Sequence, residues 1–330
     1  MNNPLISILV AAYNVSPFID QCLNSIQKQD FKNFEVIIVD DGSTDNTKNI
    51  CKQYTEKDSR FSLIEHNNNK GLLLARKSAV VQAKGLFTIF IDGDDYLFNE
   101  HSLSEINSFI QEKDCDIYRF YATIEGTTPK KKRKWENFLN SGPTYLDSSI
   151  EILEDYFLKK SHPWNLWSSC YRTSILKDVY SKVVDKKFTS CEDGYTSFLI
   201  ACNSNTYTYK KTNPIYSYRI GTGITTKKID SRTFIKRAEE YKCINWLNDY
   251  ISQSNHNHKE RIYYCLDHLE DSLASVYVRR LLSLDDKEIK QILNSEYYIP
   301  CSRKIIIKLI EKTLPLHKKI ILKIKKILNR

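Results

Sequence analysis

Three carboxylates stand together in the sequence at the end of a short apolar run. Residues 87–91 read Phe-Thr-Ile-Phe-Ile, and Asp92-Gly93-Asp94-Asp95 follows directly. A β-branched and aromatic run of this length predicts a buried strand. Like charges this close repel one another, so a cation should lie beside them. Carboxylate oxygens around a glycine turn suit Mg2+ or Mn2+, ions that commonly arrive with a phosphate group.

The same arrangement occurs twice earlier in the chain. The apolar segment 5–12 is followed by Tyr13, and the segment 34–39 is followed by Asp40 and Asp41. Both segments have the composition of buried strands. The sequence therefore predicts three strands that each end in polar side chains.

Helical and strand segments alternate around these three strands. The other expected elements are a helix within 16–30, a helix from Ser43 or Thr44 to about Tyr54, a strand at 61–65 and a helix at 71–83. Such alternation predicts a parallel α/β sheet, whose ligands bind beyond the carboxyl ends of the strands. The polar residues named above fall at those ends, which indicates one active site.

Four linked stretches resemble the family 2 glycosyltransferases, which have the GT-A fold. They read PLISILVAAYN, FEVIIVDDGSTDNT, NKGLLLARKSA and GLFTIFIDGDDYL. The resemblance continues more loosely through PWNLWSSCYRTSIL, CEDGYTSFLIA and YSYRIGTGITT, and so covers roughly residues 4–226. It implies an α/β protein with a mainly parallel central sheet flanked by helices, a Rossmann-like nucleotide-binding half and a helical C-terminal extension. It also implies an enzyme of the hexosyltransferase class, EC 2.4.

The resemblance further implies which residues bind the nucleotide. They are Ala11, Tyr13, Asp40, Asp41, Arg76, Asp92 and Gly93. Tyr13 would lie near the base, Asp40 would accept from a uracil N–H, and Asp41 would support the turn or the ribose. Arg76 would reach the base or the diphosphate, although Lys77 replaces the Asn usual in the family. Helix capping by the two aspartates and a surface position for the arginine remain open alternatives.

Asp92-Gly93-Asp94-Asp95 matches the DxD motif of the same family. The resemblance implies that Asp94 binds Mn2+ or Mg2+ directly, while Asp92 shares the metal site and faces the ribose. The ion would bridge both phosphates and act as a Lewis acid. A solvated acidic turn is the alternative.

Glu192 and Asp193 precede an apolar segment, 195–201, which we expect to be helical. They match the family's ED signature, which implies Asp193 as the general base and Glu192 as the residue that positions it. One base that takes the acceptor proton opposite a leaving nucleotide gives inversion in a single displacement. Helix N-termini also favour acids, so simple capping is the alternative.

Two further segments are candidates for completing the site. Arg219 and Thr225 belong to a glycine-containing stretch that resembles a loop closing over the diphosphate; an ordinary turn is the alternative. Trp164, Asn165 and Trp167 could line the acceptor cleft, because sugars stack on aromatic faces. Core packing of at least one tryptophan is the alternative.

Composition disfavours several other classes of protein. The chain has 330 residues, enough for a large core, and its nine cysteines form no CxxC pair, which indicates a reducing cytosol. We expect neither a signal peptide nor a transmembrane helix. The QxxRW motif of processive synthases is missing, which favours transfer of a single sugar, and no GxGxxG follows the first strand, which disfavours a dehydrogenase.

The basic residues gather at the C-terminal end of the sequence. Residues 303–330 hold ten Lys or Arg and one Glu, equal to the whole net charge of +9. At helical spacing the apolar and basic residues fall on opposite faces, which predicts binding to an anionic membrane surface. Docking on the protein core is the alternative; a nucleic-acid partner is not expected, because no motif for one is present. A second basic run, Lys130 to Lys134, is expected to be an exposed loop that adds to membrane attraction.

The expected organisation is a GT-A domain at 1–226, with a nucleotide-sugar half (1–100) and an acceptor half (101–226), a helical extension (227–302) and a basic tail (303–330). The expected function is inverting, metal-dependent, non-processive transfer of one sugar from a UDP-sugar to a saccharide hydroxyl. The saccharide would be lipid-linked, at the inner face of a plasma membrane, in cell-surface polysaccharide synthesis. A nucleotidyltransferase and a non-catalytic, membrane-associated sugar-nucleotide-binding protein are the alternatives.

Overall fold

The computed structural model describes residues 3–188, 191–222, 234, 242–281 and 285. The chain divides into two compact units, 1–226 and 227–330, and each unit is considered by itself. In the second unit the described residues form helices α10 (Cys243–Gln253) and α11 (Lys259–Leu281). These helices provide the predicted helical C-terminal part, whereas the basic tail and Thr225 lie outside the described residues.

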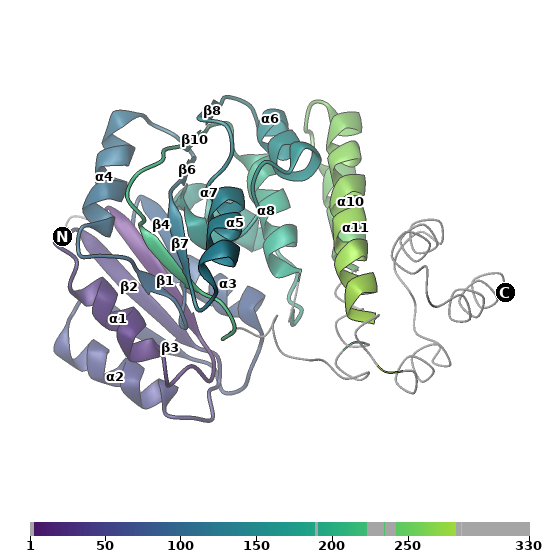
Figure 1. Ribbon diagram of the computed structural model, residues 1–330. Helices are drawn as coiled ribbons and strands as arrows, with labels where there is room; N and C mark the ends of the chain where they lie inside the picture. The colour runs from purple at the N-terminus through teal and green to yellow at the C-terminus, as the bar shows by residue number, and fades with distance from the viewer. Residues whose placement is uncertain (1–2, 189–190, 223–233, 235–241, 282–284, 286–330) are drawn as a thin grey trace. The chain divides into compact units, whose positions relative to one another are not determined.

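A large mixed sheet forms the centre of the first unit (Figure 1). In the described residues its strand order is β3-β2-β1-β4-β9-β6-β10-β8. The strands are β1 (Ile6–Ala12), β2 (Phe34–Asp40), β3 (Phe61–Glu65), β4 (Phe87–Asp92), β6 (Ile117–Arg119), β8 (Tyr145–Leu146), β9 (Ser169–Arg172) and β10 (Tyr207–Tyr209). The first four run parallel, and β6 is parallel to β10, while β9 and β8 are antiparallel to their neighbours. This arrangement confirms the predicted α/β class with a mainly parallel sheet.

A smaller sheet adjoins the end of β4. Its order is β5-β11-β7, with β5 (Tyr96–Leu97) antiparallel and β7 (Ala122–Glu125) parallel to β11 (Tyr216–Arg219). Because β5 begins one residue after Asp95, this sheet holds the acidic turn against a segment more than a hundred residues away.

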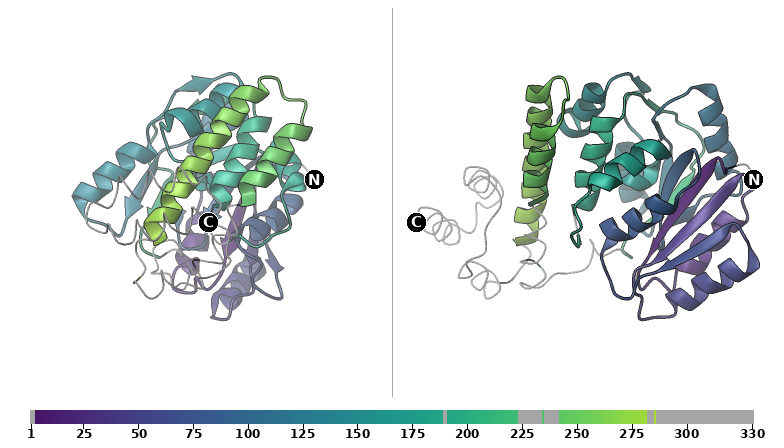
Figure 2. Two further views of the ribbon diagram at one scale, coloured as in Figure 1. Left: turned by 90° about the vertical axis from the view of Figure 1, so that its right-hand side faces the viewer. Right: turned by 180° about the vertical axis from the view of Figure 1, so that it is seen from behind.

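Helices cover both faces of the large sheet (Figures 1 and 2). They are α1 (Ile19–Gln27), α2 (Thr47–Lys57), α3 (Leu72–Gln82), α4 (Ser102–Glu112), α5 (Pro129–Leu139), α6 (Ser149–Glu154), α7 (Thr173–Lys182) and α8 (Glu192–Asn203). A π-helical turn spans Asp155–Lys159 and a 3-10 turn spans Leu166–Ser168. Helices α1, α2 and α4 share one core with the sheet, and α3 packs on β1 and β2 from the other side, next to α7.

The central strands read as continuous apolar runs because both of their faces are covered. In β1, Ile6, Ile8 and Val10 are fully buried in the core shared with α1 and α2, and Leu9 is buried as well. A strand packed on both sides needs apolar residues at every position, so the alternating pattern of a half-exposed strand is lost. The same packing makes the first polar residue mark the point where each strand ends.

Three local predictions were wrong. Helix α2 begins at Thr47, because Ser43 and Thr44 are bonded to Asn14 instead of capping the helix. The basic run at Lys130 to Lys134 is part of helix α5 rather than a loop, with a proline in the first turn. Helix α8 begins at Glu192, so both acids of the ED pair lie inside its first turn.

Among the helices that the structure describes, none combines the length and the apolar character needed to cross a bilayer.

Candidate functional site

The carboxyl ends of β1, β2 and β4 lie side by side, as the sequence predicts. In the parallel register Ala12 pairs with Asp40, and Ala11 pairs with Asp92. The Ala11 carbonyl accepts from the Gly93 N–H at 3.1 Å, and a Cβ on that glycine would lie 3.1 Å from the same oxygen. Glycine therefore lets the chain turn tightly at the end of β4.

The loops after β1 and β2 are tied to each other. Asn14, which has a left-handed backbone (φ 52°), accepts from the Thr44 N–H at 2.8 Å, and its own N–H donates to the Ser43 hydroxyl at 3.0 Å. Tyr13 beside it is 38% exposed, and Asp40 is buried at the strand end. The ring and the carboxylate predicted to bind the base are thus held at one rim of the sheet.

Asp41 organises the loop that leads into α3. Its carboxylate accepts from the backbone N–H groups of Lys70 (2.9 Å) and Gly71 (2.8 Å), and His66 Nδ1 lies 2.6 Å away. All of these contacts are buried or nearly so. Of the two roles considered for Asp41, the contacts favour support of the turn, and a contact with the ribose stays a prediction. His66 was not singled out in the sequence.

Arg76 joins the two acidic motifs. Its guanidinium, on α3, donates to Asp92 Oδ1 at 3.0 Å and to Asp193 Oδ1 at 2.5 Å. The arginine side chain is 3% exposed, whereas the two carboxylates are 25% and 27% exposed. The surface alternative for Arg76 is therefore wrong, and its aspartates remain accessible on the side away from it.

Burial and charge shift the pKa values in this group in opposite ways. Burial alone would lower the pKa of Arg76, but Asp193 and Asp92 raise it well above its usual value. Burial raises the pKa of Asp193, and the guanidinium opposes that rise. A carboxylate whose pKa is raised, and which an arginine nevertheless keeps ionised, is suited to accept a proton. Glu192, the first residue of α8, lies near enough to contribute to the electrostatic field at Arg76.

Residues near the C-terminal end of the first unit bind the DxD turn, Asp92 to Asp95. The Thr222 hydroxyl donates to Asp94 Oδ2 at 2.7 Å, and the Arg219 guanidinium donates to the Asp94 carbonyl at 2.6 Å. Asp95 is buried and accepts from the Tyr216 hydroxyl and from the Arg219 N–H, both at 2.7 Å. The predicted lid arginine therefore reaches the turn, and Thr222, which sequence reasoning missed, contacts the predicted metal ligand.

The donor set at this turn fits a divalent cation. Burial and the charge of Asp92 raise the pKa of Asp94, so a cation beside Asp94 would stabilise its ionised form. In the described part of the chain no three His, Cys, Asp or Glu side chains are grouped to hold an ion by themselves. An ion here would take one or two carboxylates and complete its shell with phosphate oxygens and water, as Mg2+ and Mn2+ commonly do.

The candidate acceptor residues differ in their surroundings. Trp167 is 6% exposed and stacks between Tyr216 and Tyr218, with centroid distances of 4.7 and 4.9 Å, so it belongs to the core. Trp164 stacks on Phe157 at 5.5 Å. The nearby Asn165 has a buried amide whose oxygen and nitrogen find no hydrogen-bond partner among the residues that the structure describes. A buried amide left unpaired is costly, so a bound ligand would be a natural partner.

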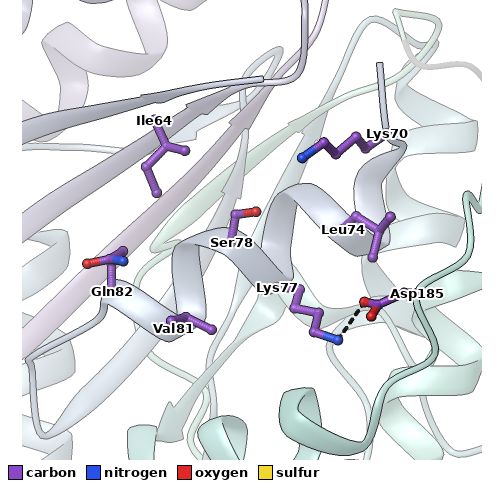
Figure 3. Close-up of a pocket in the computed structure, with 8 residues that line it drawn as sticks. All are labelled: Ile64, Lys70, Leu74, Lys77, Ser78, Val81, Gln82 and Asp185. Atoms are coloured by element: carbon purple, nitrogen blue, oxygen red, sulfur yellow. Dashed lines mark hydrogen bonds and ion pairs between the residues drawn. The ribbon is translucent and has the colours of Figure 1, made fainter. Parts of the chain in front are cut away.

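A pocket of about 610 Å3 lies on the other side of α3 (Figure 3). It is lined by Ile64, Lys70, Leu74, Lys77, Ser78, Val81, Gln82 and Asp185. Lys77, which stands where the family usually has Asn, donates to Asp185 at 2.7 Å and to the Val183 carbonyl. None of the candidate acidic residues at the sheet edge lines this pocket.

A second buried polar group lies at the end of β10, away from the motifs. His162 is 1% exposed, with Nδ1 3.0 Å from the Pro163 carbonyl and Nε2 3.2 Å from both the Tyr207 hydroxyl and Asp155. Burial and the charge of Arg119 lower the pKa of His162 to about 4. The imidazole is therefore neutral near pH 7.

The fold is that of the GT-A class of glycosyltransferases. Residues 7–170 match the family described as "Glycosyl transferase family 2". EpsH of Bacillus subtilis (strain 168), named as a glycosyltransferase, is 30% identical over 236 residues, which are 71% of this chain and 66% of that protein. The chain belongs to glycosyl transferase family 2, a family of sugar-transferring enzymes.

Other similar proteins carry more specific names. The poly(ribitol-phosphate) beta-N-acetylglucosaminyltransferase TarS of Staphylococcus aureus is 40% identical over 175 residues, which are 52% of this chain but 28% of TarS. The structure of TarS 1–349 with UDP-GlcNAc has a TM-score of 0.64 and 22% identity, covering 98% of this chain and 90% of that one. A Pyrobaculum calidifontis mannosyltransferase with GDP-Man and Mn2+ has a TM-score of 0.53 and 14% identity over 99% and 86% of the two chains. These two structures support the fold alone.

Proposed function

We propose that this protein transfers one sugar from a UDP-sugar to a hydroxyl of a saccharide acceptor in cell-surface polysaccharide synthesis, with inversion and with Mn2+ or Mg2+. The observation that carries the proposal is the Arg76 bridge. One buried guanidinium holds Asp92 of the phosphate-binding turn and Asp193 at the start of α8. A donor site and a base are thereby fixed in one rigid group, which is what a single displacement needs.

In this mechanism the acceptor hydroxyl lies against Asp193. As the hydroxyl oxygen attacks the anomeric carbon, its proton passes to the Asp193 carboxylate and the bond to the nucleotide diphosphate breaks on the opposite face. Arg76 keeps Asp193 ionised before the reaction and orients it through the 2.5 Å contact. When bound at Asp94, the metal would supply Lewis-acid stabilisation of the departing diphosphate.

Uracil rather than guanine is proposed as the base. Asp40 is buried at the end of β2 and can accept from one ring N–H, while Tyr13 remains exposed enough to stack beside it. One structural neighbour binds UDP-GlcNAc and another binds GDP-Man. Guanine also carries a ring N–H, so the proposal of uracil rests on the motif resemblance and is tested by the titration described below. Asn165, whose buried amide has no hydrogen-bond partner in the described part of the chain, is proposed to face the acceptor.

A lipid-linked acceptor at the inner face of the plasma membrane completes the proposal. Its support is the segregation of basic and apolar residues in 303–330, which favours attachment to anionic lipid.

The proposal is tested by calorimetric titration with UDP, GDP and CMP, each with and without Mn2+. We expect metal-dependent binding of UDP that is lost in Asp94→Asn and kept in Asp193→Asn. Asp193→Asn should lose turnover by a factor of about 10²–10⁴, the usual contribution of a general base. The matched control is Asp178→Asn, an exposed acid on α7 paired with Lys182.

Preference for GDP would refute the uracil assignment and leave the fold intact. Full turnover in Asp193→Asn would refute the assignment of Asp193 as the general base. Absence of nucleotide binding under all conditions would favour a non-catalytic role.

A further inference from the structure

We propose that helix α5 is a membrane-contact surface that lies on an anionic bilayer, separate from the C-terminal tail. The proposed contact is separate from the transfer reaction, and none of the residues proposed to touch the bilayer belongs to the donor site. Its basis is one helix face on which unpaired cations and exposed aromatic rings occur together.

One face of α5 is fixed to the small sheet. Glu136 accepts from the Thr123 hydroxyl at 2.6 Å and from the Ile124 N–H at 3.2 Å, both on β7, and Leu139 is 5% exposed. Lys132 lies on the same side, 3.7 Å from Glu136. These contacts fix the rotation of the helix about its axis, so its opposite face lies at the protein surface. Figure 1 shows α5 lying along β7.

The opposite face carries two rings and two lysines in contiguous positions. Trp135 is 49% exposed and Phe138 is 42% exposed, three residues apart on one side of the helix. Lys131 and Lys134 each precede one of these rings by four residues, so each stands next to it on the helix surface. Within the described residues neither lysine has an ion pair.

Further cations extend this surface toward the start of the helix. Lys130 and Arg133 are exposed and also lack an ion pair in the part of the chain that the structure describes. Together with Lys131 and Lys134, these two residues give the outer side of α5 four cations without an ion pair among the described residues.

The combination favours a bilayer over an anionic polymer. Cations alone would suit either partner, because both present phosphate groups. An exposed phenylalanine gains little from a solvated polyphosphate, whereas the headgroup region accommodates Trp and Phe together with Lys and Arg. Charge complementarity and ring exposure therefore point to the same occupant.

The position of α5 would bring the proposed membrane contact close to the donor site. Strand β7 leads into the helix, and its last residue, Glu125, pairs with Arg219 of β11. Arg219 in turn donates to the Asp94 carbonyl. A bilayer touching the start of α5 would thus lie next to the rim of the DxD turn, where an acceptor carried on a lipid has to arrive.

The first test is tryptophan fluorescence of the full chain with vesicles of phosphatidylcholine alone or mixed equally with phosphatidylglycerol. We expect a blue shift and quenching by brominated lipid with the anionic vesicles, and loss of most of that response in Trp135→Phe. This variant keeps a ring for insertion and removes the reporter, so binding itself should persist. If the tail alone binds, Trp135→Phe will respond like the parent protein, which would overturn the proposal.

The second test measures the partition coefficient by vesicle flotation. Each cation near an anionic surface contributes about fivefold, so Lys131→Ala with Lys134→Ala should weaken partitioning about 25-fold. Lys28→Ala with Lys57→Ala is the matched control, because both lysines are exposed and lie away from α5, one directly after α1 and the other at the end of α2. Equal partitioning of the two double variants would overturn the proposal.

The same assay measures the contribution of the rings, and a parallel measurement with polyphosphate tests the alternative partner. Trp135→Ala with Phe138→Ala should weaken partitioning, while Phe98→Ala, an exposed ring at the other end of β11, should not. Loss of binding to polyphosphate with unchanged vesicle binding in the lysine variant would refute the bilayer as the partner. Because no sugar nucleotide is present, failure here leaves the proposed transfer reaction untouched.

Discussion

The bridge formed by Arg76 predicts a strong energetic coupling between the two acidic motifs. Arg76→Met removes the charge but retains much of the side-chain volume, and leaves Asp92 and Asp193 facing each other across a buried gap. Asp193→Asn removes one of the two charges that the guanidinium neutralises. The two substitutions should therefore be far from additive.

The magnitude follows from burial. Breaking a buried ion pair costs about 3–5 kcal/mol of unfolding free energy, because one charge is left without a partner. The arginine is 3% exposed but its carboxylates are about a quarter exposed, so water compensates part of the loss. We expect about 3 kcal/mol for Arg76→Met, at the lower end of that range, and about 2 kcal/mol for Asp193→Asn. The double variant should cost about 3 kcal/mol, a coupling of about 2 kcal/mol.

The assay is urea unfolding without nucleotide and with a chelator, followed by tryptophan fluorescence. Trp164 and Trp167 are packed inside the first unit and report its unfolding. The control cycle uses Arg60 and Asp58, whose 2.6 Å pair lies in the turn after α2, with the arginine 23% exposed. For that pair we expect a coupling of no more than about 1 kcal/mol.

Additive effects of Arg76→Met and Asp193→Asn would refute the bridge as a structural unit. So would a coupling no larger than that of the control pair. In either case the arginine would have to be assigned to the nucleotide alone, and the ionisation of Asp193 would need another cause.

Three further outcomes follow from single contacts. Gly42→Ala should lower stability by about 3 kcal/mol in thermal unfolding, because φ is +73° and the added Cβ would meet the Asn68 backbone at 2.6 Å. Burial lowers the pKa of His162 to about 4, so the unfolded chain binds its proton first on acidification. Stability measured by urea unfolding should be complete above about pH 6.5 and fall by about 3 kcal/mol toward pH 4, while His162→Gln should remove this dependence. Thr222→Val should weaken metal-dependent UDP binding in calorimetry about fivefold, since Asp94 loses one hydrogen bond, and an unchanged affinity would contradict that role.

The strands of the donor half could be predicted from the sequence because their burial is complete. Parallel strands covered on both faces need apolar residues throughout, so the change from Ile91 to Asp92 marks the end of β4 without ambiguity. The same reasoning placed Asp40 at the end of β2. Helix starts were less predictable, since Ser43 and Thr44 are good capping residues that bond to Asn14 in the folded chain.

Contacts between distant segments could not be predicted in this way. Thr222 and Asp94 are 128 positions apart, and Arg76 and Asp193 are 117 apart. Their meeting depends on antiparallel β9 and on the small sheet, whose strands of two to four residues carry no periodic signal. The motif resemblance identified Arg76, Asp92 and Asp193 separately. That one guanidinium binds both aspartates could be seen only in the folded chain.

The charges at the sheet edge also imply an order of binding. Asp92, Asp94 and Asp193 converge on one region of the sheet edge. Among the residues that the structure describes, the guanidiniums bonded to this region are those of Arg76, which donates to two carboxylates, and Arg219, which donates to a carbonyl and to Gln21. A free nucleotide diphosphate would bring further negative charge toward this turn and be repelled. A diphosphate already neutralised by a divalent cation would not. The electrostatics therefore favour the metal–nucleotide complex over the free nucleotide, and affinity for UDP should rise steeply with metal concentration until the complex is fully formed.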